Sequence, residues 1–292
     1  MNPGDLVWRV GAEFDPKRQL GRVRRALTGG DRSLRDAVAG KRVVLTGASA
    51  GIGRETALLL GAAGAEVVLV ARRADRLEEL AEEIGRRGGS ALARPCDLTD
   101  DDQVDALVAD VGTGADVLVN NAGHSIRRAL SRAGDPMNDI ERLMRLNFFG
   151  ALRLTLPVVA AMRERGGGHV VNVSTLAVQV GAQPLFAGYL ASKAAMDAFA
   201  RSAAPETRRD GVHWTTVHMP LVRTDMIAPT RVYRELPAMS ARSGAEMIVR
   251  AVIHRPVRVS HPAGVAGQLT DLVAPDAVER VMGRAARWSG GL

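Results

Sequence analysis

Residues 46–53 read Thr46-Gly47-Ala48-Ser49-Ala50-Gly51-Ile52-Gly53, a stretch in which glycine takes three of eight positions. The short apolar run Val43–Leu45 precedes this stretch, and the helix-like segment Arg54–Ala63 follows it. Glycines at such a turn let the backbone approach a pyrophosphate, which then meets the unpaired N–H groups of the helix N-terminus. The octet alone is a weak signal, but between a strand and a helix it predicts a dinucleotide-binding turn.

Short apolar runs recur along the chain with helix-length segments between them. Val67–Val70, Val117–Val119 and Val170–Val173 are the clearest, and Val212–Val217 and Val257–Val259 are weaker. Short buried strands that alternate with helices build βαβ units with right-handed crossovers. The pattern therefore predicts an α/β fold, a Rossmann doubly wound parallel sheet, with ligands at the carboxyl ends of its strands.

The composition favours one large domain. The 292 residues are 46% hydrophobic and 24% charged, as is typical of a globular chain. Only 3% are aromatic, so Ala, Val and Leu must fill the core, which suits a parallel sheet buried on both faces. We predict an N-terminal arm over residues 1–39, a catalytic domain over 40–262 and a C-terminal helical segment over 263–292 that packs on the domain.

The net charge of +7 comes almost wholly from arginine, because Lys17, Lys41 and Lys193 are the only lysines. Attraction to phosphorylated ligands, membranes or nucleic acid is one interpretation of this charge. The interspersed acids favour a bias in composition instead, and we predict no nucleic-acid partner. The basic run Lys17–Arg25 contains no acid, and it leaves open a packed arm, an oligomer contact or a peripheral membrane contact.

The chain has one cysteine, Cys96, so no intrachain disulfide can form. Its six histidines lack the spacing of a metal site, and we predict no metal. No apolar stretch reaches about 18 residues, and the N-terminus does not resemble a signal peptide. The expected location is the cytoplasm.

The end of the second predicted strand indicates the cofactor. The strand runs into Ala71-Arg72-Arg73, where an NAD enzyme of this fold would place an acid for the ribose 2′-hydroxyl. An arginine there can grip a 2′-phosphate bidentately, although arginines at a strand end can also be simply solvated. Given the glycine-rich turn upstream, the residues favour NADP(H).

Tyr189 and Lys193 form the candidate chemical centre. They are four residues apart and so lie on one face of a helix. A tyrosine with a pKa of about 10 is a poor acid–base catalyst, but a nearby ammonium, together with the positive nicotinamide of an oxidised cofactor, would lower that pKa. Tyr189 could then give a proton to a carbonyl oxygen as hydride arrives, or take one from an alcohol.

Three motifs resemble the classical branch of the short-chain dehydrogenase/reductase superfamily. They are the TGxxxGxG octet, the NNAG of Asn120–Gly123 and the YxxxK of Tyr189–Lys193, and the resemblance extends from Lys41 to about Pro262. In that family the PGxVxT segment binds the nicotinamide amide, and Met219–Thr224 resembles it with Leu221 in place of glycine. The cofactor contacts that the turn, the arginine pair and the resemblance together imply are Gly47, Ser49, Gly51, Ile52, Gly53, Arg72, Asp97, Leu98, Asn121, Ala122, Gly123, Tyr189, Lys193, Pro220, Val222 and Thr224.

The resemblance also implies two further catalytic residues. Asn147 is similar to the asparagine that holds a water linking the lysine to solvent. A hydroxyl at the end of the Val170–Val173 strand would orient the substrate oxygen, and we choose Thr175. Its separation from Tyr189 is 14 residues rather than the commoner 13, which leaves Ser174 open.

Longer stretches look like the reductase domain of bacterial fatty acyl-CoA reductases and nearby actinobacterial dehydrogenases. These stretches are Asn120–Arg128, Leu146–Leu154, Tyr189–Phe199 and His218–Tyr233. They imply a long-chain acyl-CoA or fatty aldehyde as substrate, and the apolar content of residues 225–262 fits an apolar substrate or ordinary core packing equally well.

Two other functions compete with this one. A reductase of the same family could act on other ketones and alcohols, or the chain could be a non-catalytic NADP(H)-binding sensor or scaffold. The presence of both Tyr189 and Lys193 argues against the scaffold. Members of the family usually pair through long central helices, so a homodimer or homotetramer is expected.

Overall fold

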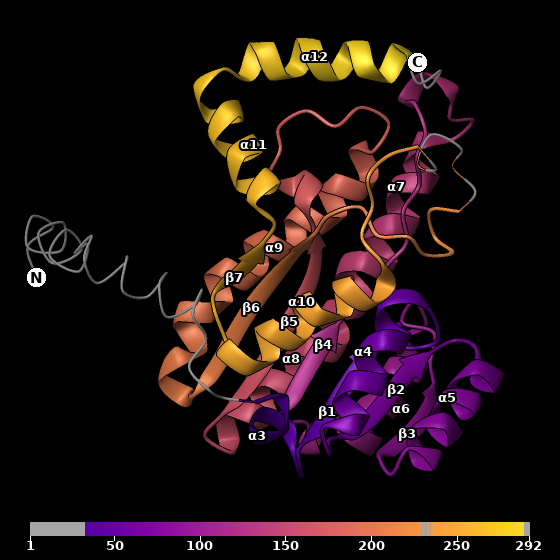
Figure 1. Cartoon of the computed structure of the whole chain (residues 1–292), viewed down its shortest axis with the longest axis vertical. Helices are drawn as coiled ribbons and strands as arrows, with labels where there is room; N and C mark the ends of the chain where they lie inside the picture. The colour runs from indigo at the N-terminus through magenta and orange to yellow at the C-terminus, as the bar shows by residue number, and fades with distance from the viewer. Residues whose placement is uncertain (1–32, 229, 231–232, 234, 289–292) are drawn as a thin grey trace, which may run out of the picture. The chain divides into compact units, whose positions relative to one another are not determined.

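The computed structural model describes residues 33–228, 230, 233 and 235–288. Residues 1–32, which include the basic run of the predicted arm, lie outside the described residues. The described part contains a seven-stranded sheet whose pairings are all parallel (Figure 1). The strands are β1 (Arg42–Thr46), β2 (Glu66–Ala71), β3 (Ser90–Pro95), β4 (Val117–Asn120), β5 (Gly168–Thr175), β6 (Val212–Met219) and β7 (Arg258–Ser260).

The strand order is β3-β2-β1-β4-β5-β6-β7. The chain runs outward from β1 in one direction and from β4 in the other, so the predicted doubly wound Rossmann sheet is confirmed. Its topological switch point lies between the carboxyl ends of β1 and β4, where ligands bind in folds of this kind. Both the glycine-rich turn and the NNAG segment begin there.

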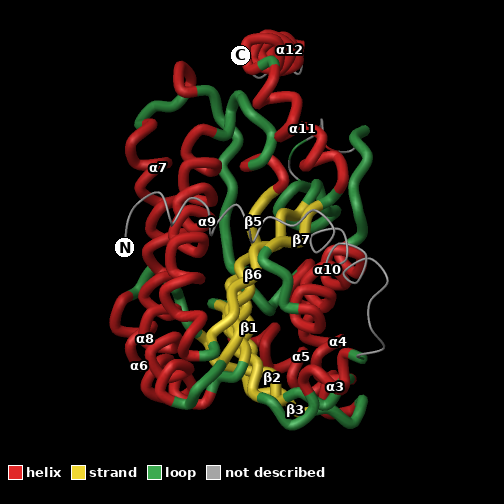
Figure 2. Tube along the Cα trace, turned by 90° about the vertical axis from the view of Figure 1, so that its left-hand side faces the viewer, coloured by secondary structure: helices red, strands yellow, loops and turns green. Residues whose placement is uncertain are grey.

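Helices cover both faces of the sheet (Figure 2). One face carries α3, α4, α5 and α10, and the other carries α6, α8 and α9 with α7 beside α9. A π-helical turn, η3 (Arg145–Gly150), joins α7 to α8, and a short 3₁₀ turn, η4 (Leu176–Val178), follows β5. The helices are α3 (Leu34–Val38), α4 (Gly51–Ala62), α5 (Ala74–Arg86), α6 (Asp101–Val111), α7 (Pro136–Met144), α8 (Ala151–Glu164), α9 (Ala187–Thr207), α10 (Ala241–His254), α11 (Pro262–Val273) and α12 (Pro275–Trp288).

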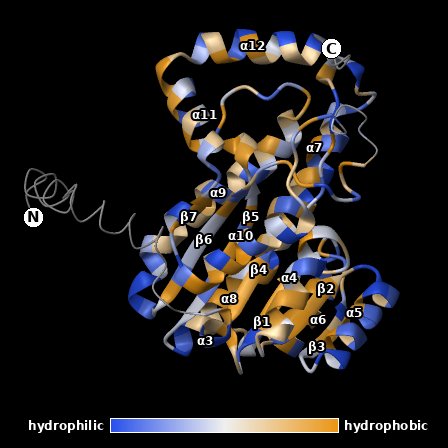
Figure 3. Cartoon of the chain, viewed as in Figure 1, coloured by the Kyte–Doolittle hydropathy of each residue, from blue (hydrophilic) through white to orange (hydrophobic). Residues whose placement is uncertain are grey.

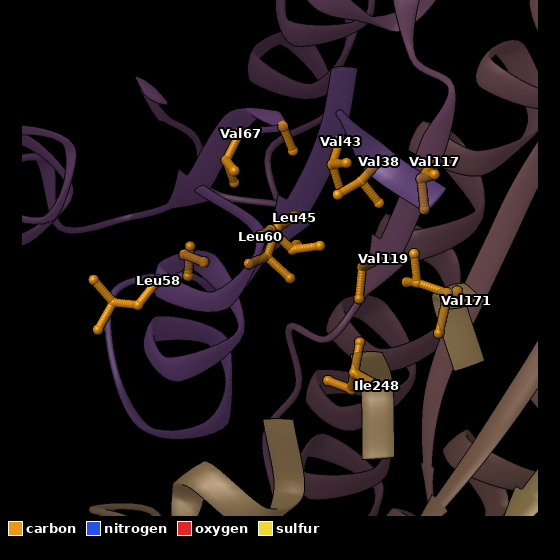
Figure 4. Packing of buried hydrophobic residues seen from close by; sticks show 14 of the residues in the cluster. Val38, Val43, Leu45, Leu58, Leu60, Val67, Val117, Val119, Val171 and Ile248 are labelled. Carbon is orange, nitrogen blue, oxygen red and sulfur yellow. The ribbon is translucent and has the colours of Figure 1, made fainter. Parts of the chain in front are cut away.

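The strands carry the core because their β-branched runs are buried on both faces. Val43, Leu45 and Val67 point toward one helical layer, where Leu60 of α4 and Ile248 of α10 meet them (Figure 4). The hydropathy colouring shows the apolar strands enclosed by helices with polar outer surfaces (Figure 3). This rigid sheet holds the loops at its carboxyl edge in fixed positions.

Two elements differ from what the residue pattern indicated. The strand β3 has no apolar run, because it is an edge strand that pairs with β2 alone and is mostly half-exposed. The helix α3 lies within the segment expected to form an arm, yet its Ala37 and Val38 belong to the main core. Helices α11 and α12 occupy the predicted C-terminal helical segment.

One continuous helical stretch of the described residues, Pro136–Glu164, is long and apolar enough to cross a membrane. Nearly half of its most apolar window is buried inside the protein. Within it, Leu154, Val158 and Met162 of α8 pack in the core cluster beneath the sheet. A core helix therefore accounts for the composition of this stretch.

Candidate active site

The glycine-rich turn connects β1 to α4 at the switch point of the sheet. Gly47 and Gly51 have φ angles of 67° and 55°, in the left-handed region that favours glycine. A Cβ on Gly53 would lie 2.1 Å from the carbonyl oxygen of Gly47, so the first turn of α4 touches the loop backbone directly. No described side chain caps the N-terminus of α4, whose Ile52 and neighbours leave N–H groups available to a pyrophosphate. The turn therefore fits a dinucleotide.

Thr46 ties this turn to the NNAG segment. Its buried hydroxyl accepts hydrogen bonds from the backbone N–H groups of Asn121 and Ala122, each at 3.0 Å, and donates one to Val119. The side-chain amide of Asn121 donates in return to the carbonyl oxygens of Thr46 and Gly47. Asn121 thus shapes the cofactor site through the backbone of the turn.

Two arginines rim the turn at the end of β2. The Arg73 guanidinium donates to the Ser49 hydroxyl at 3.0 Å, and Arg72 lies 3.9 Å from a carboxylate oxygen of Asp97. The other oxygen of Asp97 is held by hydrogen bonds from its own loop, and Leu98 beside it is buried. Sequence reasoning chose Arg72, but the structure brings Arg73 into direct contact with the turn. Arg73 is therefore the arginine that lies beside Ser49.

The segment after β6 lies against the glycine-rich turn, at Gly51. Pro220 leaves the sheet, Val222 is buried and pairs with Met239, and Thr224 follows. A Cβ on Gly51 would lie 2.9 Å from the Thr224 methyl carbon, so this segment contacts the glycine-rich turn. The predicted cofactor residues of the first, fourth and sixth strands therefore gather at one edge of the sheet.

Tyr189 and Lys193 lie one turn apart in α9, beside the end of β5. The Thr175 hydroxyl lies close enough to Tyr189 to lower the pKa of its phenol, and the Thr175 oxygen accepts a hydrogen bond from the backbone N–H of Ala177 at 3.3 Å. The Ser174 hydroxyl is buried and has no hydrogen-bond partner in the part of the chain that the structure describes. Of the two hydroxyls, Thr175 is the one that acts on Tyr189.

Asn147 lies in the π-helical turn η3, a distortion that often marks functional sites. Its side-chain oxygen accepts from the backbone N–H of His124 at 2.8 Å, and its amide donates to the carbonyl oxygen of His124 and to the Ser192 hydroxyl, each at 2.9 Å. A Cβ on Gly123 would lie 3.1 Å from the Lys193 Nζ and 3.2 Å from the Asn147 Oδ1. The predicted asparagine, lysine and NNAG glycine therefore meet at one point.

Burial dominates the protonation of the two central residues. Burial raises the pKa of Tyr189 to about 12, an effect that the Thr175 hydroxyl partly offsets and nearby Tyr233 reinforces. Burial lowers the pKa of Lys193 to about 8, and the charge of Asp197 acts in the opposite direction. The expectation that Lys193 lowers the pKa of Tyr189 is not met in the chain by itself, because loss of solvation outweighs the other influences on the phenol.

Sequence reasoning missed three residues of the site. Thr46 and Ser192 are buried hydroxyls that hold backbone or amide groups, and His124 contributes its main chain to Asn147. Their partners lie 23 to 76 residues away in the chain, so the local motifs that contain Thr46 and Ser192 do not indicate these contacts. Within the described residues no cluster of three or more His, Cys, Asp or Glu could hold a metal ion.

Comparison with known proteins identifies relatives of this chain. The family model described as short chain dehydrogenase matches residues 41–234. A fatty acyl-CoA reductase of Mycobacterium tuberculosis is 46% identical over 248 residues, covering 84% of both chains. A fatty acyl-CoA reductase of Acinetobacter baylyi is 43% identical over 245 residues, covering 83% of both. The solved actinorhodin polyketide ketoreductase with NADPH is 29% identical, with a TM-score of 0.67 over 77% of this chain and 97% of its own.

Proposed function

Because the chain belongs to the short-chain dehydrogenase family, we propose that it is an NADP(H)-dependent oxidoreductase in which Tyr189 exchanges a proton with a carbonyl or alcohol oxygen. One observation carries the proposal. Tyr189 and Lys193 lie one helical turn apart in α9, with Thr175 of β5 near the Tyr189 phenol and Gly123 of the NNAG segment beside the Lys193 ammonium. These are the groups that proton transfer to a substrate oxygen requires.

The chain's own residues supply the proton chemistry. Because burial raises the pKa of Tyr189 to about 12, its phenol carries a proton at neutral pH that it can give to a carbonyl oxygen. Thr175 would orient the substrate oxygen through its hydroxyl, and the Lys193 ammonium would offset the negative charge that Tyr189 acquires. Asn147, which makes three hydrogen bonds, would hold the water that links Lys193 to solvent. Bound NADPH supplies the hydride.

The preference for NADP(H) is supported by Arg73, which contacts Ser49 of the turn, and by Arg72 next to it at the end of β2. We expect Arg72→Ala and Arg73→Ala each to raise the dissociation constant for NADPH by about 10- to 100-fold, because each removes charge-assisted hydrogen bonds to the 2′-phosphate. The dissociation constant for NADH, which lacks that phosphate, should change by less than about threefold. Cofactor fluorescence titration measures both.

Arg86→Ala is the matched control for these variants. Arg86 is an exposed arginine on α5 whose ion pair is with Glu82, and its loss should leave both dissociation constants unchanged. If the Arg72 and Arg73 variants weaken NADPH and NADH equally, the arginines shape the turn and do not select the phosphate.

We further propose an apolar acyl substrate, a fatty acyl-CoA or a fatty aldehyde. Two relatives of 46% and 43% identity bear the name fatty acyl-CoA reductase. In the segment after β6, the side chains of Met226 and Leu236 are 51% and 44% exposed, so this segment offers apolar surface to a substrate. A ketone substrate is the second candidate, because a polyketide ketoreductase is also similar to the chain.

A substrate panel distinguishes these candidates. We expect NADPH oxidation with palmitoyl-CoA or hexadecanal to exceed that with short and cyclic ketones. Reduction of a thioester releases one CoA thiol for each acyl group that reaches the aldehyde, and a thiol reagent measures it. The background is low because the chain's one cysteine, Cys96, is buried. Turnover of ketones alone would exclude the acyl substrate, and aldehyde turnover without thiol release would exclude the thioester.

A further inference from the structure

Three polar side chains from three elements form a hydrogen-bonded network between α9 and the sheet. Asp197 of α9, His218 of β6 and Ser260 at the end of β7 meet inside the layer between helix and sheet. The His218 Nε2 lies 2.7 Å from a carboxylate oxygen of Asp197, and its Nδ1 lies 3.2 Å from the Ser260 hydroxyl. The side chains of Asp197 and His218 are 7% and 3% exposed. A carboxylate so deeply buried needs partners that stabilise its charge.

Two protonation states of His218 satisfy these contacts, because its Nδ1 can accept from the Ser260 hydroxyl or donate to it while the Nε2–H donates to Asp197. The imidazole is neutral in the first state and a cation in the second, and Asp197 is an anion in both. Its second carboxylate oxygen, Oδ1, is buried and has no hydrogen-bond partner among the described residues. The negative charge of Asp197 is therefore only half satisfied by hydrogen bonds.

Lys193 is the neighbouring group with the opposite charge. Lys193 and Asp197 are four residues apart in α9, so their side chains leave the same face of the helix. Lys193 is 8% exposed, and its ammonium donates to the carbonyl oxygen of Val173 at 2.9 Å. Asp197 is the charged group that acts on Lys193. Without a counter-charge, burial lowers the pKa of an ammonium further.

We propose that Asp197 is a positioning residue that keeps Lys193 in its charged form, and that His218 and Ser260 hold the carboxylate in place for this purpose. The proposal rests on the proposed function, since it assigns Asp197 a role through the lysine of that site. Other titratable side chains around the pair are Tyr189, one turn before Lys193 on α9, and His218 of β6, which contacts Asp197, and Tyr233 acts on Tyr189.

The direction in which loss of the Asp197 charge shifts the pKa of Lys193 follows from charge alone. Burial lowers the pKa of Lys193 to about 8, and Asp197 counteracts that lowering. Removing the negative charge must lower the pKa of Lys193 further, because a cation without its counter-ion is less stable. Lys193 would then be neutral over part of the pH range in which the enzyme works.

The chain offers a direct measurement of this pKa. It has three lysines, Lys17, Lys41 and Lys193, so a protein grown on 13C-labelled lysine gives three Cε signals that can be titrated by NMR without substrate or cofactor. Assignment follows from Lys17→Arg and Lys41→Arg. We expect Asp197→Asn to lower the titration midpoint of Lys193 by about one pH unit or more.

Matched variants separate charge from structure. Asp197→Ser is a second neutral replacement of different size, and it should lower the midpoint as Asp197→Asn does. Asp197→Glu keeps the negative charge, so the titration midpoint of Lys193 should stay close to that of the parent protein. Glu206→Gln removes an exposed carboxylate near the C-terminal end of the same helix and should leave the midpoint unchanged. An unchanged midpoint in whichever neutral Asp197 variant folds would overturn the proposal.

The pH profile of turnover supplies a second readout. The ratio of kcat at about pH 9 to kcat at about pH 6.5 should fall roughly tenfold in Asp197→Asn relative to the parent protein, because Lys193 loses its charge in that range. A purely structural defect would lower kcat by the same factor at both pH values, and that result would also overturn the proposal. Since the NMR titration needs no turnover, its outcome is independent of whether the proposed reaction is correct.

Discussion

Tyr189→Phe is expected to lower kcat by about 10²- to 10⁴-fold while the dissociation constant for NADPH stays within about threefold. The substitution removes only the phenolic oxygen. The ring keeps its edge-to-face contact with Phe186, so the site should keep its shape. What is lost is the proton donor beside Thr175, and hydride transfer to a carbonyl carbon then leaves an uncompensated negative charge on the substrate oxygen. Single-turnover kinetics with NADPH measure the rate of hydride transfer directly.

Tyr233→Phe is the informative companion. The chain has two tyrosines, and Tyr233 lies close enough to influence the protonation of Tyr189. It is therefore the one other phenol that could act as the acid. If Tyr233→Phe abolishes turnover and Tyr189→Phe does not, the roles assigned here are reversed. If neither variant loses activity, the reaction does not depend on a phenolic proton.

Local patterns predicted the parts of this molecule that depend on local chemistry. The glycine-rich turn was predictable because a turn at Gly47 and Gly51 demands φ angles that other residues avoid. The Tyr189–Lys193 pair was predictable because four residues make one helical turn. The central strands were predictable because burial on both faces requires continuous apolar runs, as in Val67–Val70.

Features that depend on distant segments could not be predicted in this way. Ser192 and Asn147 meet across 45 residues, and the pattern of either segment alone does not indicate the contact. The choice between Ser174 and Thr175 was open because spacing along the chain does not say which side chain faces α9. The edge strand β3 was missed since partial exposure leaves Ser90–Pro95 without an apolar run. The pKa of Tyr189 depends on burial, which only the packed structure reveals.

The glycine-rich turn makes a second strong prediction, for Gly53→Ala. Gly53 is helical, a position at which alanine normally stabilises a protein. Here a Cβ would lie 2.1 Å from the carbonyl oxygen of Gly47 and 2.8 Å from the side-chain nitrogen of Asn121. Backbone cannot rotate away as a flexible side chain can, so the turn must shift. We expect the free energy of unfolding to fall by about 1–3 kcal/mol in urea denaturation without cofactor.

The same shift should weaken cofactor binding by at least about tenfold, because the turn's N–H groups no longer converge on the pyrophosphate. Gly85→Ala is the matched control. Gly85 is an exposed glycine in α5, and a Cβ there would meet nothing within 4 Å. Its replacement should raise the free energy of unfolding by up to about 1 kcal/mol through lower backbone entropy of the unfolded chain, with NADPH binding unaffected. If Gly53→Ala matches Gly85→Ala in both stability and NADPH affinity, close packing of α4 on the turn does not determine cofactor binding, and the selection of glycine at position 53 needs another cause.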